Sequence, residues 1–423
     1  MLGEVLQWQY PADAVLSHWF RAHKNAGLRD RGEIAEAVFD VLRHLRRYRQ
    51  FAESGQGAAT RRLAILGLAS VWSRDILDTG LEEHEKPWLD HVQAFDLSNL
   101  SPAVRHSVPE WLESQLMALP DAEALLRALN QPAPLDLRIN PFKTDRDTVL
   151  QAWAQGPESK WPAQPTPYSP WGMRIQGRPP INRWRSFERG EIEVQDEGSQ
   201  LLAALVGPKR GEMVIDYCAG AGGKTLLLGA LMRSTGRLYA FDVSAARLAR
   251  AKPRFARSGL SNIVPVVIAD KNDQRVKRLR GKAHRVLVDA PCSGLGTLRR
   301  NPDLKWRQHA ETLAQLLVTQ AAILEDAAAC VRPGGRLVYA SCSLLPQENE
   351  QQVQAFLEKH PDFVLLDAST VLADRGIQLP LDGPMLQLRP DVHGTDGFFA
   401  AVMQRNKPDV AEPGDTEDEP APE

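Results

Sequence analysis

The second half of the chain alternates apolar, strand-like runs with helical segments, and this alternation limits the possible fold more than any other feature. Five runs after Gln195 fit buried strands: MVIDY, RLYAFDV, IVPVVIAD, RVLVDAP and RLVYASC. Helical patterns such as TLLLGALM and AARLARAKPRFARSG lie between them. Such alternation indicates a parallel, doubly wound sheet with right-handed crossovers. We therefore expect an α/β, Rossmann-like domain over residues 196–405.

Two further parts precede this domain. From Ala12 to about Leu119, apolar residues recur at three- and four-residue spacing, which predicts an all-helical domain over residues 1–130. Residues 131–195 are rich in Pro and Trp and contain strand-like pieces such as LDLRIN and GMRIQ, so we expect a small α/β subdomain there. Residues 406–423 are strongly acidic and predict a disordered tail.

Composition narrows the class of protein. No apolar run approaches the ~20 residues of a membrane span, and the N-terminus lacks the pattern of a secretory signal, so we expect a cytoplasmic, non-membrane protein. Four cysteines in 423 residues are too few for a disulfide framework. The net charge of -2 includes an acidic tail of -6, which leaves +4 for the rest. A mildly basic body is compatible with a phosphate-rich partner, but equally with ordinary solvated charge.

A glycine-rich turn follows the first predicted strand, in the sequence DYCAGAGGKT. Gly220, Gly222 and Gly223 would let the backbone approach a ligand at the positive end of a helix dipole. Asp242 closes the next strand, 20 residues after Gly222, where a carboxylate can bind ribose hydroxyls. Loop and acid together predict a nucleoside cofactor.

Three more acids end strands on the same predicted edge of the sheet, namely Asp216, Asp270 and Asp289. Ligands of open α/β sheets bind at the carboxyl ends of the strands, so these acids would surround one crevice. Any one of them could instead cap a helix. By themselves, the loop and the acids leave NAD and S-adenosylmethionine undecided.

Two cysteines follow two of the predicted strands, Cys292 in VLVDAPCSGLG and Cys342 in LVYASCSLLPQE. A thiolate that adds to carbon 6 of cytosine makes carbon 5 nucleophilic enough to accept a methyl group, and a second acid/base group can assist the later steps. The residues alone do not decide which thiol attacks. Cys330, within a helical run, and Cys218, within the glycine loop, are interpreted as packing residues.

Four motifs in this order, DYCAGAGGKT, DAPCSGLGTLRRNPDLKWR, YASCSLLPQENE and TDGFFAA, closely resemble the Sun/RsmB family of RNA (cytosine-C5) methyltransferases. With LDLRINPFKT and VQDEGSQL, the resemblance covers about residues 130–405. The segment LSHWFRAHKNAGLRDRGEIAEAVFDVLRHLRR is more loosely similar to the NusB-like, RNA-binding domain of RsmB-type enzymes. The resemblance implies a class I methyltransferase fold that uses S-adenosyl-L-methionine.

The resemblance also implies roles for single residues. Cys342 would be the nucleophile, Cys292 would assist product release, and Asp289 would lie near both the methyl donor and the target cytosine. The implied cofactor-binding residues are Cys218, Ala219, Gly220, Ala221, Gly222, Gly223, Lys224, Asp242, Asp270 and Asp289. The family's commoner loop reads CAAPGGK and this one reads CAGAGGK, so we expect a slightly less rigid loop that still binds cofactor.

Basic and aromatic residues predict contacts with RNA. Residues 271–285 and 297–307 are rich in Lys and Arg. The helical domain adds Arg43, Arg46, Arg47 and Arg49, and Trp184 and Trp306 offer faces for unstacked bases. We expect a monomer without a metal that methylates small-subunit ribosomal RNA. The alternatives are a tRNA or DNA cytosine-5 methyltransferase, or a catalytically inactive, RNA-binding ribosome assembly factor.

Overall fold

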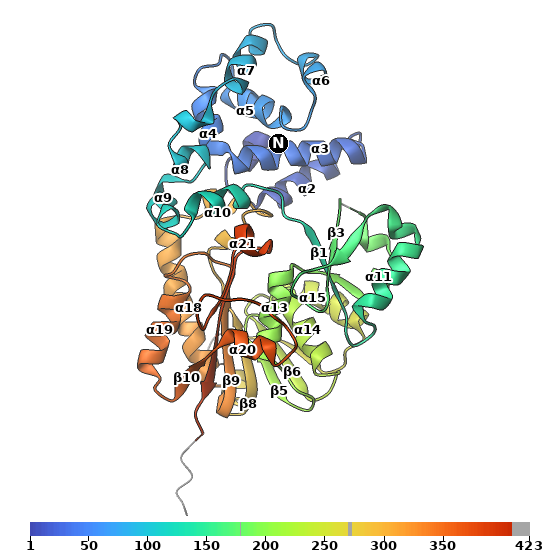
Figure 1. Ribbon diagram of the computed structural model, residues 1–423, viewed down its shortest axis with the longest axis vertical. Helices are drawn as coiled ribbons and strands as arrows, with labels where there is room; N and C mark the ends of the chain where they lie inside the picture. The colour runs from blue at the N-terminus through green and yellow to red at the C-terminus, as the bar shows by residue number, and fades with distance from the viewer. Residues whose placement is uncertain (178, 270–272, 408–423) are drawn as a thin grey trace, which may run out of the picture.

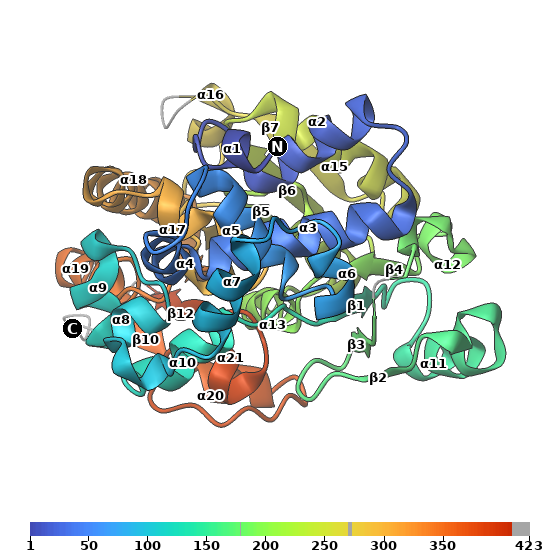
Figure 2. The ribbon, with the colours of Figure 1, turned by 90° about the horizontal axis from the view of Figure 1, so that it is seen from above.

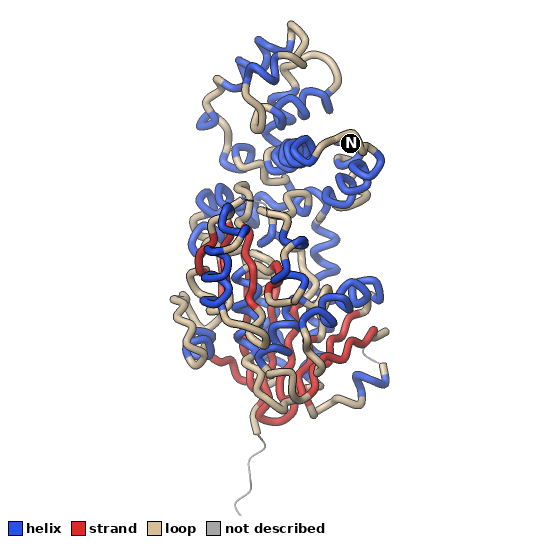
Figure 3. Tube along the Cα trace, turned by 90° about the vertical axis from the view of Figure 1, so that its right-hand side faces the viewer, coloured by secondary structure: helices blue, strands red, loops and turns tan. Residues whose placement is uncertain are grey.

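The computed structural model describes residues 1–177, 179–269 and 273–407. A helical domain stands above one end of a large α/β domain, and a small α/β subdomain lies at the side (Figure 1). Seen from above, the first helices overlie the large sheet (Figure 2), and the strands are confined to the lower two parts (Figure 3). Within the described ranges, no helix combines the length and apolar character needed to cross a membrane.

The N-terminal domain is all-helical. Its packing follows from apolar spacing, since Val38, Val41 and Leu42 of α3 and Leu45 of α4 are buried at three- and four-residue intervals. The helices are α1 (Leu2–Val5), α2 (Ala12–Ala22), α3 (Leu28–Arg43), α4 (Leu45–Ala52), α5 (Ala59–Leu68), α6 (Arg74–Asp78), α7 (Glu85–Gln93), α8 (Pro102–Arg105), α9 (Glu110–Met117) and α10 (Ala122–Leu129).

The small subdomain is an antiparallel sheet with the strand order β2-β3-β1-β4. Its elements are β1 (Leu135–Ile139), α11 (Arg146–Gln155), β2 (Ala163–Pro165), β3 (Gly172–Ile175), α12 (Arg185–Glu188) and β4 (Ile192–Val194). Both faces of β1 are buried: Leu137 and Ile139 face the subdomain's own core, whereas Asp136 and Arg138 lie on the opposite face. That second face is therefore available to contact the large domain.

Trp184 belongs to the core of this subdomain. It is 7% exposed, and its ring lies 4.5 Å from that of Trp153 in an edge-on arrangement. The prediction that Trp184 stacks on an unstacked base is therefore wrong, because its faces are covered by other side chains.

The large domain contains an 8-stranded sheet with the order β10-β12-β9-β8-β5-β6-β7, and β11 pairs with β12. Its strands are β5 (Met213–Asp216), β6 (Arg237–Asp242), β7 (Ile263–Val267), β8 (Ala283–Asp289), β9 (Val331–Ser341), β10 (Phe363–Leu366), β11 (Leu386–Leu388) and β12 (Phe398–Arg405). The five strands predicted from the sequence are β5 to β9, and they pair in parallel. The predicted Rossmann-like fold is confirmed.

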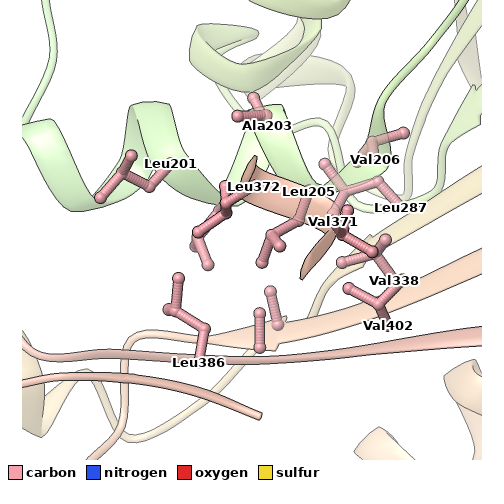
Figure 4. Packing of buried hydrophobic residues seen from close by; sticks show 14 of the residues in the cluster. Leu201, Ala203, Leu205, Val206, Leu287, Val338, Val371, Leu372, Leu386 and Val402 are labelled. Carbon is pink, nitrogen blue, oxygen red and sulfur yellow. The ribbon is translucent and has the colours of Figure 1, made fainter. Parts of the chain in front are cut away.

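Helices cover both faces of this sheet. The helices of the large domain are α13 (Glu197–Val206), α14 (Gly223–Leu231), α15 (Ala245–Ser258), α16 (Gln274–Lys277), α17 (Leu304–Arg307), α18 (Ala310–Ala328), α19 (Glu350–Lys359), α20 (Ala368–Ala373) and α21 (Pro390–His393), of which α17 and α21 lie toward the helical domain. On one face α13, α14 and α20 pack leucines and valines against β8, β9 and β12 (Figure 4). On the other face, buried apolar side chains of α16, α18 and α19 form one cluster with side chains of β8, β9 and β12.

The strand β12 completes the sheet in a way the alternation did not predict. It runs antiparallel to β9, with Phe399 paired to Ser341 and Met403 to Leu337. Residues 398–403 are buried without the polar alternation of a half-exposed strand, because β12 lies between β9 and β10 with helices on both sides.

The helical domain packs on the loops that follow β8 and β9. Leu295 and Leu345 of these loops are fully buried in one cluster with Leu112 and Leu116 of α9 and Leu125 of α10. The carboxyl ends of the central strands therefore face the helical domain. Polar contacts reinforce this junction at α17, where the side chains of two consecutive residues reach backbone carbonyls at the end of α3.

Lys305 is one of these two residues. It is 4% exposed, and its Nζ donates to the carbonyl of Arg43 at 2.9 Å. Burial, aided by the charges of Arg43 and Arg47, lowers the pKa of Lys305 to about 7. The prediction that Lys305 contacts a phosphate backbone is wrong, since the helical domain covers its ammonium group.

This buried lysine should make stability depend on pH. An unfolded lysine keeps its proton up to about pH 10, so the unfolded state binds more protons than the native state between about pH 7 and pH 10. Across this window the free energy of unfolding of the wild type should rise relative to that of Lys305→Met, by at most about 1.4 kcal/mol per pH unit. Urea denaturation at several pH values measures the difference. The exposed Lys277→Met is the control, and a Lys305→Met difference that is constant with pH would contradict the expectation.

Candidate active site

The glycine loop connects β5 to α14, as the sequence predicted, and two of its glycines have left-handed backbone angles. Gly220 has φ +57° and Gly222 has φ +80°. A Cβ atom on Gly222 would lie 2.4 Å from the ring of Phe255, so only glycine fits. A Cβ on Gly220 would meet nothing closer than 4.0 Å. The loop is thus packed on the side of Gly222 and open on the side of Gly220, where a ligand has room.

Asp242 ends β6 beside this loop. Its Oδ2 accepts from the backbone N–H of Gly220 at 2.8 Å, and its Oδ1 accepts from that of Ser244 at 2.7 Å. The carboxylate is 3% exposed. Asp242 therefore holds the loop in shape, and its role toward a ribose stays a prediction. Asp270, the other acid expected to contact the nucleoside, lies outside the described residues.

Asp216, at the end of β5, is buried beneath the loop. Its Oδ2 accepts from the hydroxyl of Thr225 at 2.7 Å, and its Oδ1 has no hydrogen-bond partner. Burial raises the pKa of Asp216 to about 7, against the effect of the Thr225 hydrogen bond. An unsatisfied carboxyl oxygen at the carboxyl end of a central strand fits a site that accepts a polar ligand.

Lys224 and Asp289 form an ion pair between the loop and the end of β8. The Nζ of Lys224 lies 2.8 Å from Oδ2 of Asp289. Burial opposes the charge on Lys224, but Asp289, with a smaller effect from Cys342, raises its pKa, so the ammonium form persists. The pair places one positive and one negative group beside the cofactor loop.

Cys292 and Cys342 meet in space although 50 residues separate them in the chain. Their Sγ atoms are 3.2 Å apart, and the backbone N–H of Cys342 donates to Sγ of Cys292 at 3.3 Å. The hydrogen bond with Cys342 and burial raise the pKa of Cys292 well above its ordinary value. Cys292 is therefore held as a thiol next to Cys342, and both are partly accessible.

The other two cysteines lie in different surroundings. Cys330 is fully buried in the core against α18, and burial raises its pKa to about 11. Cys218 begins the glycine loop, and burial also raises its pKa. Both environments suppress the thiolate. They agree with the interpretation of these two residues as packing groups.

The small subdomain braces the cofactor loop, a contact that the sequence did not reveal. Arg138 of β1 donates to the carbonyl of Gly223 at 2.6 Å and to the side chain of Gln195. Arg254 of α15, held by Glu193 of β4 at 3.0 Å, donates to the carbonyl of Ala221 at 2.6 Å. The available signal was an arginine within the apolar run LDLRIN, which is unusual for a buried strand unless its charge has partners.

Several basic residues predicted to contact RNA have structural partners instead. Arg43 is 5% exposed and bonds to Glu36, and Arg47 donates to the carbonyl of Arg105. In residues 297–307, Arg299 and Arg300 pair with Asp396. Arg43, Arg47 and Arg299 are therefore bonded within the protein and do not present a free positive charge to RNA.

Other predicted RNA contacts lie at the surface. Arg49 and the basic residues of 277–282 are exposed. Arg49, Arg46, Trp111 and Trp306 line a groove of about 780 Å³ between the helical domain and α17. The Nε1 of Trp306 donates to the carbonyl of Leu42 at 2.7 Å, which fixes its ring at the edge of this groove.

Known proteins with similar sequences define the class of the chain. Residues 203–404 match the family model described as 16S rRNA methyltransferase RsmB/F, and residues 108–182 match the ferredoxin-like domain of RsmF/B-like methyltransferases. The second match begins at the end of the helical domain and so includes α9 and α10. With the glycine loop and its acids, these matches define an S-adenosylmethionine-dependent methyltransferase.

Individual relatives identify the family. A probable ribosomal RNA small subunit methyltransferase B from Synechocystis sp. is 37% identical over 314 residues, which are 73% of this chain and 69% of that protein. The ribosomal RNA small subunit methyltransferase B of Sodalis glossinidius is 34% identical over 71% of this chain and 66% of that protein. The chain belongs to the RsmB/F family.

Solved structures share the fold. A methyltransferase homolog protein from Pyrococcus horikoshii has a TM-score of 0.61 and 26% identity, and the similarity covers 74% of this chain and all of that one. NSun6 from Pyrococcus horikoshii with SFG, an analogue of S-adenosylmethionine, has a TM-score of 0.61 and 21% identity over 71% of this chain and 98% of that one.

The packing around Gly222 leads to a test of the cofactor loop. Gly222→Ala should cost about 2 to 4 kcal/mol of stability, since a left-handed alanine is strained and its Cβ clashes with Phe255. We expect binding of S-adenosylmethionine, measured by calorimetry, to weaken at least about tenfold because the loop must move. Gly211→Ala is the matched control, with φ +79° and nothing within 4 Å of the added Cβ. Equal effects of the two variants would contradict a role of the Phe255 contact.

Proposed function

We propose that this protein transfers the methyl group of S-adenosylmethionine to carbon 5 of a cytosine in RNA, most directly small-subunit ribosomal RNA. The observation that carries the proposal is the pair of thiols 3.2 Å apart beside the Lys224–Asp289 ion pair and the cofactor loop. Bound at the loop, S-adenosylmethionine supplies an electrophilic methyl group. A thiol pair is not needed to bind this cofactor, so its presence points to covalent chemistry on the substrate.

Cys342 is the nucleophile in this proposal. Its sulfur forms a bond to carbon 6 of the cytosine, which moves electron density onto carbon 5 and allows that carbon to take the methyl group. Loss of the carbon 5 proton then permits the carbon 6–sulfur bond to break, and the sulfur leaves with the bonding electrons. The charge of Cys342 contributes to the raised pKa of Lys224, so the ammonium group lies near this sulfur.

Cys292 assists the second half of the reaction. Its raised pKa keeps it protonated beside the sulfur that must leave, so it is suited to exchange protons near the adduct. The assignment of attack to Cys342 and of assistance to Cys292 comes from the family resemblance. The protonated state of Cys292 supports it, because a thiol is a poor nucleophile.

Asp289 and Lys224 orient the base. A carboxylate at the end of β8 can accept a hydrogen bond from the amino group or a protonated ring nitrogen of cytosine and stabilise charge that develops there. The ion pair fixes both side chains before the substrate arrives, so that little reorganisation is needed during the reaction.

The RNA must present the cytosine unstacked, because a thiol cannot reach carbon 6 within a helix. The groove that contains Arg49, Trp111 and Trp306 supports binding of a phosphate backbone at the junction with the helical domain. The exposed basic residues of 277–282 precede β8 and so lie at the edge of the sheet opposite the thiols, which argues against the prediction that they contact RNA at the site. The relatives' names support ribosomal RNA over tRNA. The presence of both thiols and of an intact cofactor loop argues against an inactive assembly factor.

Substitution of each cysteine tests the division of labour. With labelled S-adenosylmethionine and unmodified ribosomal RNA, Cys342→Ala should abolish 5-methylcytosine, because no bond to carbon 6 can form. Cys292→Ala should accumulate a covalent protein–RNA adduct that is visible on a denaturing gel. Cys330→Ala is the control and should behave as the wild type in the assay. Methylation by Cys342→Ala would refute the assignment, and methylated tRNA with unmethylated ribosomal RNA would favour the tRNA alternative.

The role of Asp289 can be separated from that of the thiols. Asp289→Asn keeps the size of the side chain but removes the charge, and we expect kcat to fall by about 100-fold, as for loss of one group that stabilises developing charge. Because the variant leaves the buried Lys224 unpaired, its thermal stability must be measured alongside. A folded Asp289→Asn protein with unchanged turnover would exclude a role for this carboxylate in the reaction.

A further inference from the structure

Glu348 is a buried carboxylate in the loop that carries Cys342, where it bonds to the loop that carries Cys292. It lies seven residues after β9, just before α19, and it is fully inaccessible to solvent. None of the ion pairs formed by the described residues includes Glu348. Its charge is held by neutral donors alone, which is an expensive arrangement unless each donor is well placed.

The donors come from the cysteine loops and from α18. Oε1 accepts from the backbone N–H of Ser293 at 2.8 Å and from Nε2 of Gln320 at 2.9 Å. Oε2 accepts from the hydroxyl of Ser293 at 2.5 Å and from that of Ser343. Ser293 directly follows Cys292, and Ser343 directly follows Cys342. One carboxylate is therefore bonded to the neighbours of both reactive cysteines.

Further bonds make this connection rigid. The carbonyl of Glu348 accepts from the hydroxyl of Tyr339 at 2.7 Å, which fixes the backbone that carries the carboxylate. Gln320 also donates to the carbonyl of Pro291 at 3.0 Å, immediately before Cys292. The backbone N–H of Gly296 donates to the carbonyl of Cys342 at 2.9 Å. The two loops are thus joined at several points, and Glu348 is the residue that bonds to both.

We propose that Glu348 is a positioning residue that holds the Cys292 and Cys342 loops in register, so that the two sulfurs keep the separation and direction the methylation requires. This inference rests on the proposed function. Glu348 does not touch the reacting atoms, since its bonds are to the serines that follow the two cysteines and not to the sulfurs. Its effect reaches the reaction through the geometry of the two loops.

The charge of Glu348 has a second consequence for Cys292. The pKa of Cys292 is raised most by the hydrogen bond with Cys342, then by burial and by the charge of Cys342. The negative charge of Glu348 raises it further. A negative group on that side of the site disfavours a thiolate at Cys292. It thereby helps to keep the two cysteines chemically distinct although their side chains are in contact.

Two variants separate geometry from charge. In Glu348→Gln the amide oxygen can take the place of Oε1, where both donors are N–H groups, and the amide nitrogen can face the two serine hydroxyls, which can rotate to accept. The variant thus removes the charge while keeping a complete set of hydrogen bonds. Ser343→Ala instead removes the hydroxyl that ties Glu348 to the residue after Cys342, together with the bond that this hydroxyl accepts from the N–H of Leu345 at 3.1 Å, and leaves the charge in place.

The first measurement is steady-state methylation of ribosomal RNA. For Ser343→Ala we expect kcat to fall by about tenfold to 100-fold with KM for S-adenosylmethionine within about twofold of the wild type, because the cofactor loop is not involved. Glu85→Gln is the matched control, since Glu85 is also buried, at 3% exposed, but pairs with Arg61 in the helical domain. A Ser343→Ala enzyme with wild-type kcat would overturn the positioning role.

The second measurement needs neither RNA nor cofactor. The rates at which iodoacetamide alkylates Cys292 and Cys342 are read separately by mass spectrometry of the folded protein. In Glu348→Gln the rate at Cys292 should rise at least about threefold relative to that at Cys342, because loss of the negative charge favours the thiolate. An unchanged ratio in Glu348→Gln together with unchanged kcat in Ser343→Ala would overturn the inference. Failure of the wild type to form 5-methylcytosine would refute the proposed function instead, while the alkylation ratio would still report on Glu348.

Discussion

The parallel pairing of β8 with β9 is the interaction on which the site depends. In this register Asp289 lies opposite Ala340, so the two strands end together and their loops leave the sheet side by side. Each loop carries one cysteine within three residues of its strand end. A shift of the register by one residue would turn every side chain of a strand to the other face of the sheet and would separate Asp289 from Lys224. The pairing of the strands therefore places the two thiols next to each other, and the local hydrogen bonds fix their relative geometry.

The parts outside the sheet act mainly as supports for these loops. The helical domain buries Leu295 and Leu345, one from each loop, under α9 and α10. The small subdomain acts on the cofactor loop at the same carboxyl edge of the sheet, where Arg138 bonds to the first turn of α14. Each accessory part therefore contacts a different half of the site, the thiol loops in one case and the cofactor loop in the other. A protein reduced to the large sheet would lose both supports, which gives a physical reason for their covalent linkage to the catalytic domain.

The sequence predicted what depends on local patterns and on the rule that parallel strands end at one edge. Strands β5 to β9, the glycine loop, and the proximity of Cys292 and Cys342 all follow from apolar runs and the residues after them. Features that depend on distant partners were missed. Arg138 and Glu348 are charged residues whose partners lie elsewhere in the chain. Trp184 was assigned to RNA binding because the sequence alone does not show whether a tryptophan is buried or exposed. Asp242 was expected to bind ribose, and its bond to Gly220 became visible only in three dimensions.

The cost of burying a charge explains how the charged groups of the site are arranged. Burial makes any isolated charge expensive, so each charged group near the thiols is matched to a particular kind of partner. Lys224 has a carboxylate, Asp242 has backbone N–H groups, and Glu348 has neutral donors. Among the residues that the structure describes, none forms an ion pair with Glu348, and its charge adds to the effects that raise the pKa of Cys292. The two thiols in contact thus have different surroundings, which supports the proposal that Cys342 attacks and Cys292 carries a proton.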